Sequence, residues 1–191
     1  MLTFHAEPVA EAVRHWLESV VIGLNLCPFA RRELAAERVR FAVTPAATEA
    51  GLLEALRDEL ELLEHDSRIE TTLLIHPAVL QSFADYNQFL NAADSLLAGM
   101  QLEGVIQVAS FHPDYQFAGT GPDDAENFTN RSPYPLLHLL REASVERAID
   151  ALPEVAQIPL RNVELMNQMG RDALQDLVRS CCAGVPTGDR Q

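Results

Sequence analysis

The chain has 191 residues, and its 28 acidic side chains against 14 basic ones give a formal net charge of −14. A chain of this length fits one domain, and so negative a charge argues against nucleic acid or an anionic membrane surface as a partner. The hydrophobic fraction of 48% excludes a disordered or collagen-like chain. We expect a single α/β domain over residues 6–182 and a flexible C-terminal tail over residues 183–191, where Gly and Pro are frequent.

The residue types that the chain uses also limit its possible catalytic mechanisms and indicate its cellular compartment. All 14 basic residues are arginine, which excludes mechanisms that need a lysine amine, such as a Schiff base. The cysteines are odd in number and two are adjacent, which is typical of a reducing compartment. Residues 1–8 do not resemble a signal peptide, and the longest apolar runs are too short to span a membrane. We therefore expect a cytoplasmic protein.

Hydrophobic periodicity predicts alternating helices and strands up to residue 111. A first amphipathic helix is expected over residues 6–22, ending at Gly23. Apolar alternation or β-forming runs predict strands over residues 39–44, 71–76 and 104–111, and helical patterns from 48 and over 78–100 connect them. This order favours parallel strands joined by right-handed crossovers. The predicted fold is α/β, with a small, mainly parallel sheet of about three strands under five or six helices; an antiparallel, ferredoxin-like α+β fold is the alternative.

The second half of the chain is predicted to be a long loop followed by helices. Residues 112–132 are polar with interleaved aromatics and have no periodicity, which is typical of a functional loop. Ser132 and Pro133 form a typical helix start, so a helix is expected over residues 133–151. Further helices are expected over residues 160–169 and 171–182.

Each predicted strand ends just before a proline, at Thr44, His76 and His112. Ligands of open parallel sheets bind outside the carboxyl ends of the strands, so His76 and His112 are candidates for proton transfer or metal ligation. The alternative is that each His-Pro pair only stops its strand and leaves a surface imidazole.

The loop and the predicted helix after it supply further polar groups. His112, Asp114 and Tyr115 lie close together in sequence, and Asn130 and Arg131 precede the expected helix start, which would favour an anion. Within that helix, the spacing places His138, Arg141 and Glu142 on one face. The alternative is a solvated stripe of ion pairs.

Cys27 is a further candidate, because Pro28 suits the first turn of a helix and a helix N-terminus favours a thiolate. The alternative is a buried, inert cysteine, and Cys181 and Cys182 near the chain end are expected to be incidental. Dinucleotide, phosphate-loop, nucleophile-elbow and zinc-peptidase motifs are absent, and the histidines lack the spacing of metal ligands. We expect no metal and no cofactor.

Three segments resemble a known family. They are Gly23-Leu-Asn-Leu-Cys-Pro-Phe-Ala30, Ser110-Phe-His-Pro-Asp-Tyr-Gln-Phe-Ala-Gly119, and Asn130-Arg-Ser-Pro-Tyr-Pro135 with Leu137-His-Leu-Leu-Arg-Glu142. They are similar to a bacterial family catalogued as domain of unknown function 1415, and the likeness extends over roughly residues 6–170. The resemblance implies one compact domain and carries no chemistry with it.

The sequence thus predicts an enzyme that acts on a small polar or anionic metabolite, with a non-catalytic ligand-binding or interaction protein as the alternative. His112 would be the general acid or base, oriented by Asp114, and His112, Arg131 and His138 would point into one pocket. No nucleic-acid or membrane partner is expected, and the oligomeric state stays open. The candidate catalytic residues are His112, Asp114, Tyr115, His138 and Cys27, and the candidate substrate-binding residues are His76, Asn130, Arg131 and Arg141.

Overall fold

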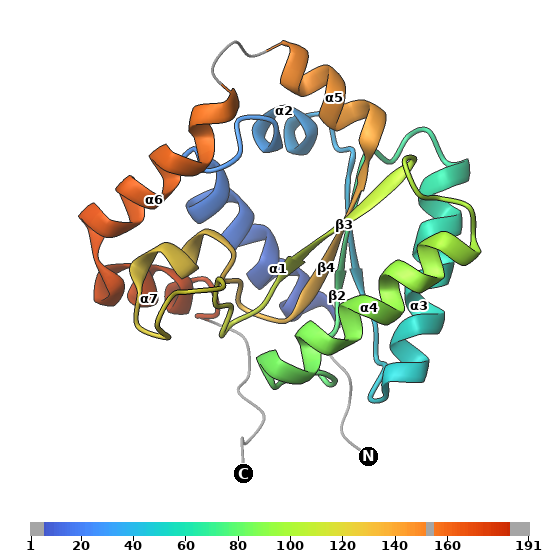
Figure 1. Cartoon of the computed structure of the whole chain (residues 1–191), viewed down its shortest axis with the longest axis horizontal. Helices are drawn as coiled ribbons and strands as arrows, with labels where there is room; N and C mark the ends of the chain where they lie inside the picture. The colour runs from blue at the N-terminus through green and yellow to red at the C-terminus, as the bar shows by residue number, and fades with distance from the viewer. Residues whose placement is uncertain (1–5, 152–154, 184–191) are drawn as a thin grey trace.

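A computed structural model describes residues 6–151 and 155–183. A four-stranded sheet lies between two layers of helices, with α3 (Glu49–His65) and α4 (Phe83–Gly99) on one face. The other face is covered by α1 (Ala6–Trp16), α6 (Ile158–Met169) and α7 (Arg171–Ser180). Figure 1 shows these layers as helices to the right and left of the strands. Residues 184–191 of the predicted tail lie outside the described residues.

The sheet is mixed, with the strand order β1-β2-β4-β3. The strands are β1 (Val39–Val43), β2 (Thr71–Ile75), β3 (Ile106–Phe111) and β4 (Leu136–Arg141). β1 and β2 are parallel, and β4 runs antiparallel to both β2 and β3. β1, β2 and β3 therefore point the same way, as predicted, but a fourth strand separates β2 from β3. The sheet is not mainly parallel, and the parallel β1–β2 pair also excludes the ferredoxin-like alternative.

The helix predicted over residues 133–151 is wrong in its first half. Leu136–Arg141 is the central strand β4, and only Glu142–Asp150 is helical, as α5. A short run of apolar residues is compatible with a buried strand as well as with a helix. The supposed cap is also absent, because the Ser132 hydroxyl donates a hydrogen bond to the Tyr134 carbonyl at 2.7 Å.

The other predicted elements are confirmed with shifted ends. The first helix continues from α1 into a π-helical segment, Leu17–Ile22, and ends at Gly23. Thr48 caps α3 as expected, by accepting a hydrogen bond from the Gly51 amide at 3.2 Å. α4 begins at Phe83 after the Ser82 cap rather than at residue 78. Short elements complete the chain: α2 (Ala30–Ala35) and the 3-10 turns Ala125–Thr129 and Val155–Gln157.

Two apolar cores fill the spaces on either side of the sheet. Leu74, Leu137 and Leu139 pack against the leucines of α3 and the aromatic residues of α4. Leu136 and Leu73 face the opposite way, toward Trp16 of α1 and Met166 of α6. Since side chains alternate along a strand, His138 lies on the same face as Leu136. None of the helices in the described part of the chain is both long enough and apolar enough to cross a bilayer.

Candidate functional site

His76 and His112 come together at the carboxyl edge of the sheet, as the sequence predicts. Both are 0% exposed, and both rings pack against the ring of Tyr86 on α4, with centroids 5.8 and 5.1 Å away. The alternative interpretation, in which each is a surface imidazole, is wrong, because α4 and the turn before it cover both rings.

Both rings are bound to the turn that precedes α4. The His112 ring donates from Nε2 to the Leu80 carbonyl at 3.1 Å and accepts the Asp114 amide at Nδ1 at 3.0 Å. The His76 ring donates from Nδ1 to the Val79 carbonyl at 3.1 Å. Leu80 sits at a φ of 57°, which is unusual for a leucine. Both histidines therefore anchor a strained turn, and neither nitrogen of His112 is left for a substrate.

His76 retains one group with no partner. Its Nε2 is buried and unbonded among the described residues. Burial lowers the pKa of His76 from 6.5 to about 4, and the nearby His112 also contributes to lowering it. Burial lowers the pKa of His112 as well. Both rings are therefore neutral at neutral pH.

The loop after β3 is held together by its own polar side chains. Asn127, which is 0% exposed, accepts hydrogen bonds from the Phe117 amide and the Thr120 hydroxyl and donates one to the Gly121 carbonyl. Arg131 donates to the Tyr115 and Pro122 carbonyls, and its guanidinium lies 4.6 Å from the centroid of the Phe128 ring. These groups are engaged in shaping the loop.

The other loop candidates are divided between the interior and the surface. Asn130 covers the free edge of β3, since its carbonyl accepts the His112 amide and its side chain donates to the Ser110 carbonyl. Tyr115 is half-buried, with its ring against Phe83 at 5.2 Å. The side chain of Asp114 is exposed.

Arg141 does not share a face with His138. Because the two residues lie on a strand and are separated by an odd number of positions, their side chains point to opposite sides of the sheet. The Arg141 guanidinium donates to the carbonyls of Leu63 and Asp66 at the end of α3 and of Ile69 in the turn that follows. This binding to carbonyls at a helix C-terminus stabilises α3. The predicted single pocket for His112, Arg131 and His138 is wrong with respect to His138, because its side chain points to the α1 and α6 side of the sheet, whereas the His112 ring packs against Tyr86 of α4 on the other side.

His138 lies on the side of the sheet that faces α1 and α6, in a row with Leu73 of β2 and Ala109 of β3. We call its half-buried surroundings the His138 face: Gln107, Ala109, Phe111, His138 and Leu140. The His138 Nε2 lies 2.7 Å from the Thr71 hydroxyl, and among the described residues no group forms a hydrogen bond with its Nδ1. Burial lowers the pKa of His138 from 6.5 to about 4, so the ring is neutral at neutral pH.

An aromatic chain leads from His138 to α1. The Phe111 ring lies 6.1 Å from the His138 ring and 5.5 Å from the Trp16 ring. Trp16 is 2% exposed, and its indole N–H has no hydrogen-bond partner in the described structure. A buried polar group without a partner is uncommon.

Cys27 is half-buried and packs against the core on this same side of the sheet. Its turn is held by α6, where Asn162 donates to the Leu26 carbonyl at 2.9 Å. Gly23 is required there, because a Cβ would lie 2.1 Å from the Ser19 carbonyl oxygen of the π-helical segment. π-helical segments are frequent at functional sites. The helix predicted from Pro28 begins at Ala30, so Cys27 precedes the helix rather than capping it.

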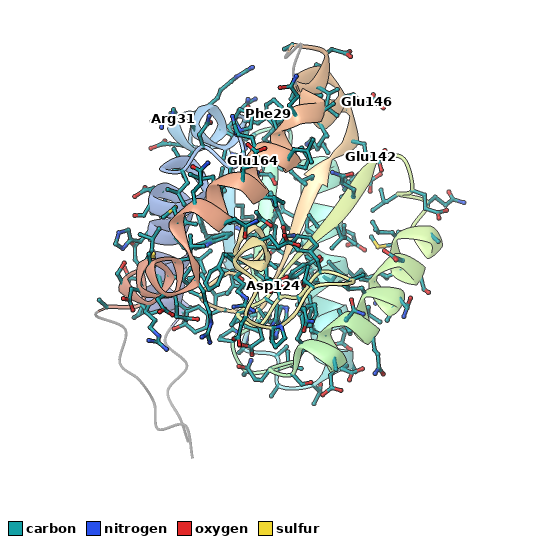
Figure 2. All side chains as sticks on the ribbon, turned by 60° about the vertical axis from the view of Figure 1, so that its left-hand side comes forward. Phe29, Arg31, Asp124, Glu142, Glu146 and Glu164 are labelled. Atoms are coloured by element: carbon teal, nitrogen blue, oxygen red, sulfur yellow. The ribbon has the colours of Figure 1, made fainter. Side chains whose placement is uncertain are left out.

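Figure 2 shows the elements that border this side of the molecule, with Phe29 just before α2, Arg31 on α2, Glu142 and Glu146 on α5, and Glu164 on α6. Two hollows of the surface lie away from His138: one between α1 and Cys181, the other between Leu24 and α6. Within the described ranges, no three His, Cys, Asp or Glu side chains gather closely enough to hold a metal ion.

Two residues near His138, Thr71 and Trp16, were not among the candidate site residues predicted from the sequence. Thr71 opens an apolar strand and meets His138 only through the pairing of β2 with β4, so no sequence spacing indicates the contact. The sequence pattern predicts Trp16 only as a core residue of an amphipathic helix. Its signal is the unpartnered indole N–H, which only the structure reveals.

Comparison with known proteins identifies the family. A family model described as "Protein of unknown function (DUF1415)" matches residues 8–176, so the chain belongs to this family, as the sequence segments indicate. No curated protein and no solved structure is significantly similar to the chain.

Proposed function

We propose that this member of the DUF1415 family is an enzyme that acts on a small polar molecule at the His138 face, with His138 as the proton acceptor. The observation that carries the proposal is an imidazole that is neutral, fixed at Nε2 by Thr71, and without a hydrogen bond at Nδ1 from any residue that the structure describes. An imidazole that is held at one ring nitrogen and can take a proton at the other has the geometry of a general base.

The surroundings of His138 support a ligand site. Gln107, Ala109 and Leu140 are only half-buried, so the centre of the sheet is not sealed by the helices on this side. Cys27 lies on the same side of the sheet and offers a thiol. In contrast, Arg131 and Arg141, on which a preference for anions would rest, are bound to backbone carbonyls.

A non-catalytic ligand-binding protein is the second candidate. One observation favours it: no hydrogen bond joins Cys27 to a histidine among the described residues, whereas activated nucleophiles commonly contact their base. If this candidate is right, a ligand binds to the His138 face and is not converted into a product.

Turnover of a metabolite panel distinguishes the two. The panel holds anionic, neutral and cationic polar molecules, and products are followed by mass spectrometry. We expect His138→Gln to lower kcat by about 100-fold or more, because a positioned base contributes that much. The matched control is His65→Gln, on the exposed surface of α3, which should leave turnover unchanged.

Two outcomes would contradict the proposal. Full turnover by His138→Gln would exclude His138 as the base. Binding of a panel compound with no turnover by the wild type would favour the ligand-binding candidate instead.

A further inference from the structure

The hydroxyl of Thr71 connects His138 to the backbone of β4. Its Oγ1 lies 2.7 Å from the His138 Nε2 and 2.6 Å from the Leu139 carbonyl oxygen. Thr71 is buried at 7% exposure. It lies on the same face of the sheet as His138, diagonally across the β2–β4 pair.

The directions of the two hydrogen bonds follow from the atoms present. The Leu139 carbonyl can only accept, so the single hydroxyl proton of Thr71 points to it. The Thr71 oxygen must therefore accept from His138, which places the ring proton on Nε2. A neutral imidazole carries one N–H, so Nδ1 holds a lone pair.

From this arrangement, which rests on the proposed function, we infer that Thr71 is the positioning residue of the site and that Nδ1 of His138 is the reacting atom. Nδ1 can accept a proton but cannot donate one. The substrate must therefore present a proton donor to it, such as a hydroxyl, amide or ammonium group. A group that offers only acceptor oxygens has no bond to make there.

Thr71 also suits the task through its shape. A β-branched side chain has few χ1 rotamers in a strand, and the neighbouring Leu139 carbonyl fixes the hydroxyl direction. When Nδ1 takes a proton, the Nε2–H bond to Thr71 becomes a charge-assisted bond, which stabilises the imidazolium. The same contact thus orients the base and favours the protonated product of the transfer.

Nitrogen-15 NMR of the histidine side chains in the full chain tests this inference without a substrate. In the wild type at neutral pH, we expect the His138 Nε2 to be protonated and Nδ1 to be unprotonated. Thr71→Ser retains the hydroxyl and should give the same tautomer. Thr71→Val removes the acceptor, and we expect a mixture of the two tautomers.

Kinetics with a substrate from the panel supply the second readout. Thr71→Val should lower kcat by about 10-fold with little change in KM, and Thr71→Ser should restore most of the rate. A wild-type ring protonated at Nδ1, or a Thr71→Val tautomer equal to that of the wild type, would overturn the inference. Because the NMR result does not depend on turnover, it decides whether Thr71 sets the tautomer of His138 even if the proposed enzyme activity fails.

Discussion

Acidification from about pH 7 to about pH 4 is expected to lower the free energy of unfolding by several kcal/mol. The pKa of His76 and of His138 falls from 6.5 to about 4 in the folded protein, and that of His112 is lowered in the same direction. Between these values the unfolded chain binds protons that the folded chain does not. The contribution of these neutral histidines to the free energy of unfolding is therefore complete above about pH 6.5 and is lost as the pH falls toward about 4.

The expected size follows from the shifts. One pKa unit corresponds to about 1.4 kcal/mol, so His76 accounts for about 3 kcal/mol at the acid end of this range. Urea unfolding at several pH values measures the effect. His76→Gln should flatten the pH dependence, whereas His65→Gln, which changes an exposed histidine, should not. Stability that is constant or that rises as the pH falls from about 7 to 5 would contradict this account.

Replacement of Asn127 by alanine is expected to destabilise the protein by about 3–5 kcal/mol. The buried side chain bonds the Phe117 amide, the Thr120 hydroxyl and the Gly121 carbonyl. Removal leaves the Phe117 amide without its partner and takes one of two donors from the Gly121 carbonyl, which still accepts the Asp124 amide. An unpaired buried polar group is costly.

Asn91→Ala is the matched control for this change. Asn91 is exposed on α4, and its side chain donates only to the Gln88 carbonyl within the same helix. We expect a change within about 0.5 kcal/mol, as for most surface substitutions. Denaturant midpoints of both variants give the comparison. A loss below about 1 kcal/mol for Asn127→Ala would show that the loop does not depend on these bonds.

The parts of the fold that follow from local pattern were predictable. Thr48 with the leucines after it indicates α3, and the alternation after Val39 indicates β1. β4 was not predictable, because a short and mostly apolar run has no clear period that distinguishes a strand from a helix. Because β4 was missed, a mainly parallel sheet was predicted, whereas the observed sheet is mixed.

The candidate site illustrates the same limit. The meeting of His76 and His112 follows from the common direction of β2 and β3, and the sequence predicts it. The hydrogen bonds of the two rings are made to the carbonyls of Val79 and Leu80. These residues lie in a turn that the sequence pattern predicts as part of a helix, so the bonds could not be predicted. Arg141 was predicted to share a helix face with His138, but both residues lie on strand β4. Because side chains alternate along a strand, Arg141 points to the side of the sheet opposite to His138.

The central claim is that His138 presents a reactive, neutral imidazole while His76 and His112 are anchors inside the fold. Diethyl pyrocarbonate, which modifies accessible neutral imidazoles, tests it directly at neutral pH when the modified peptides are mapped by mass spectrometry. We expect the exposed His15 and His65 to react first and His138 to react in the folded protein, with His76 and His112 modified only after unfolding. A His138 that stays unmodified until the protein unfolds, or a His112 that reacts before it, would contradict the account.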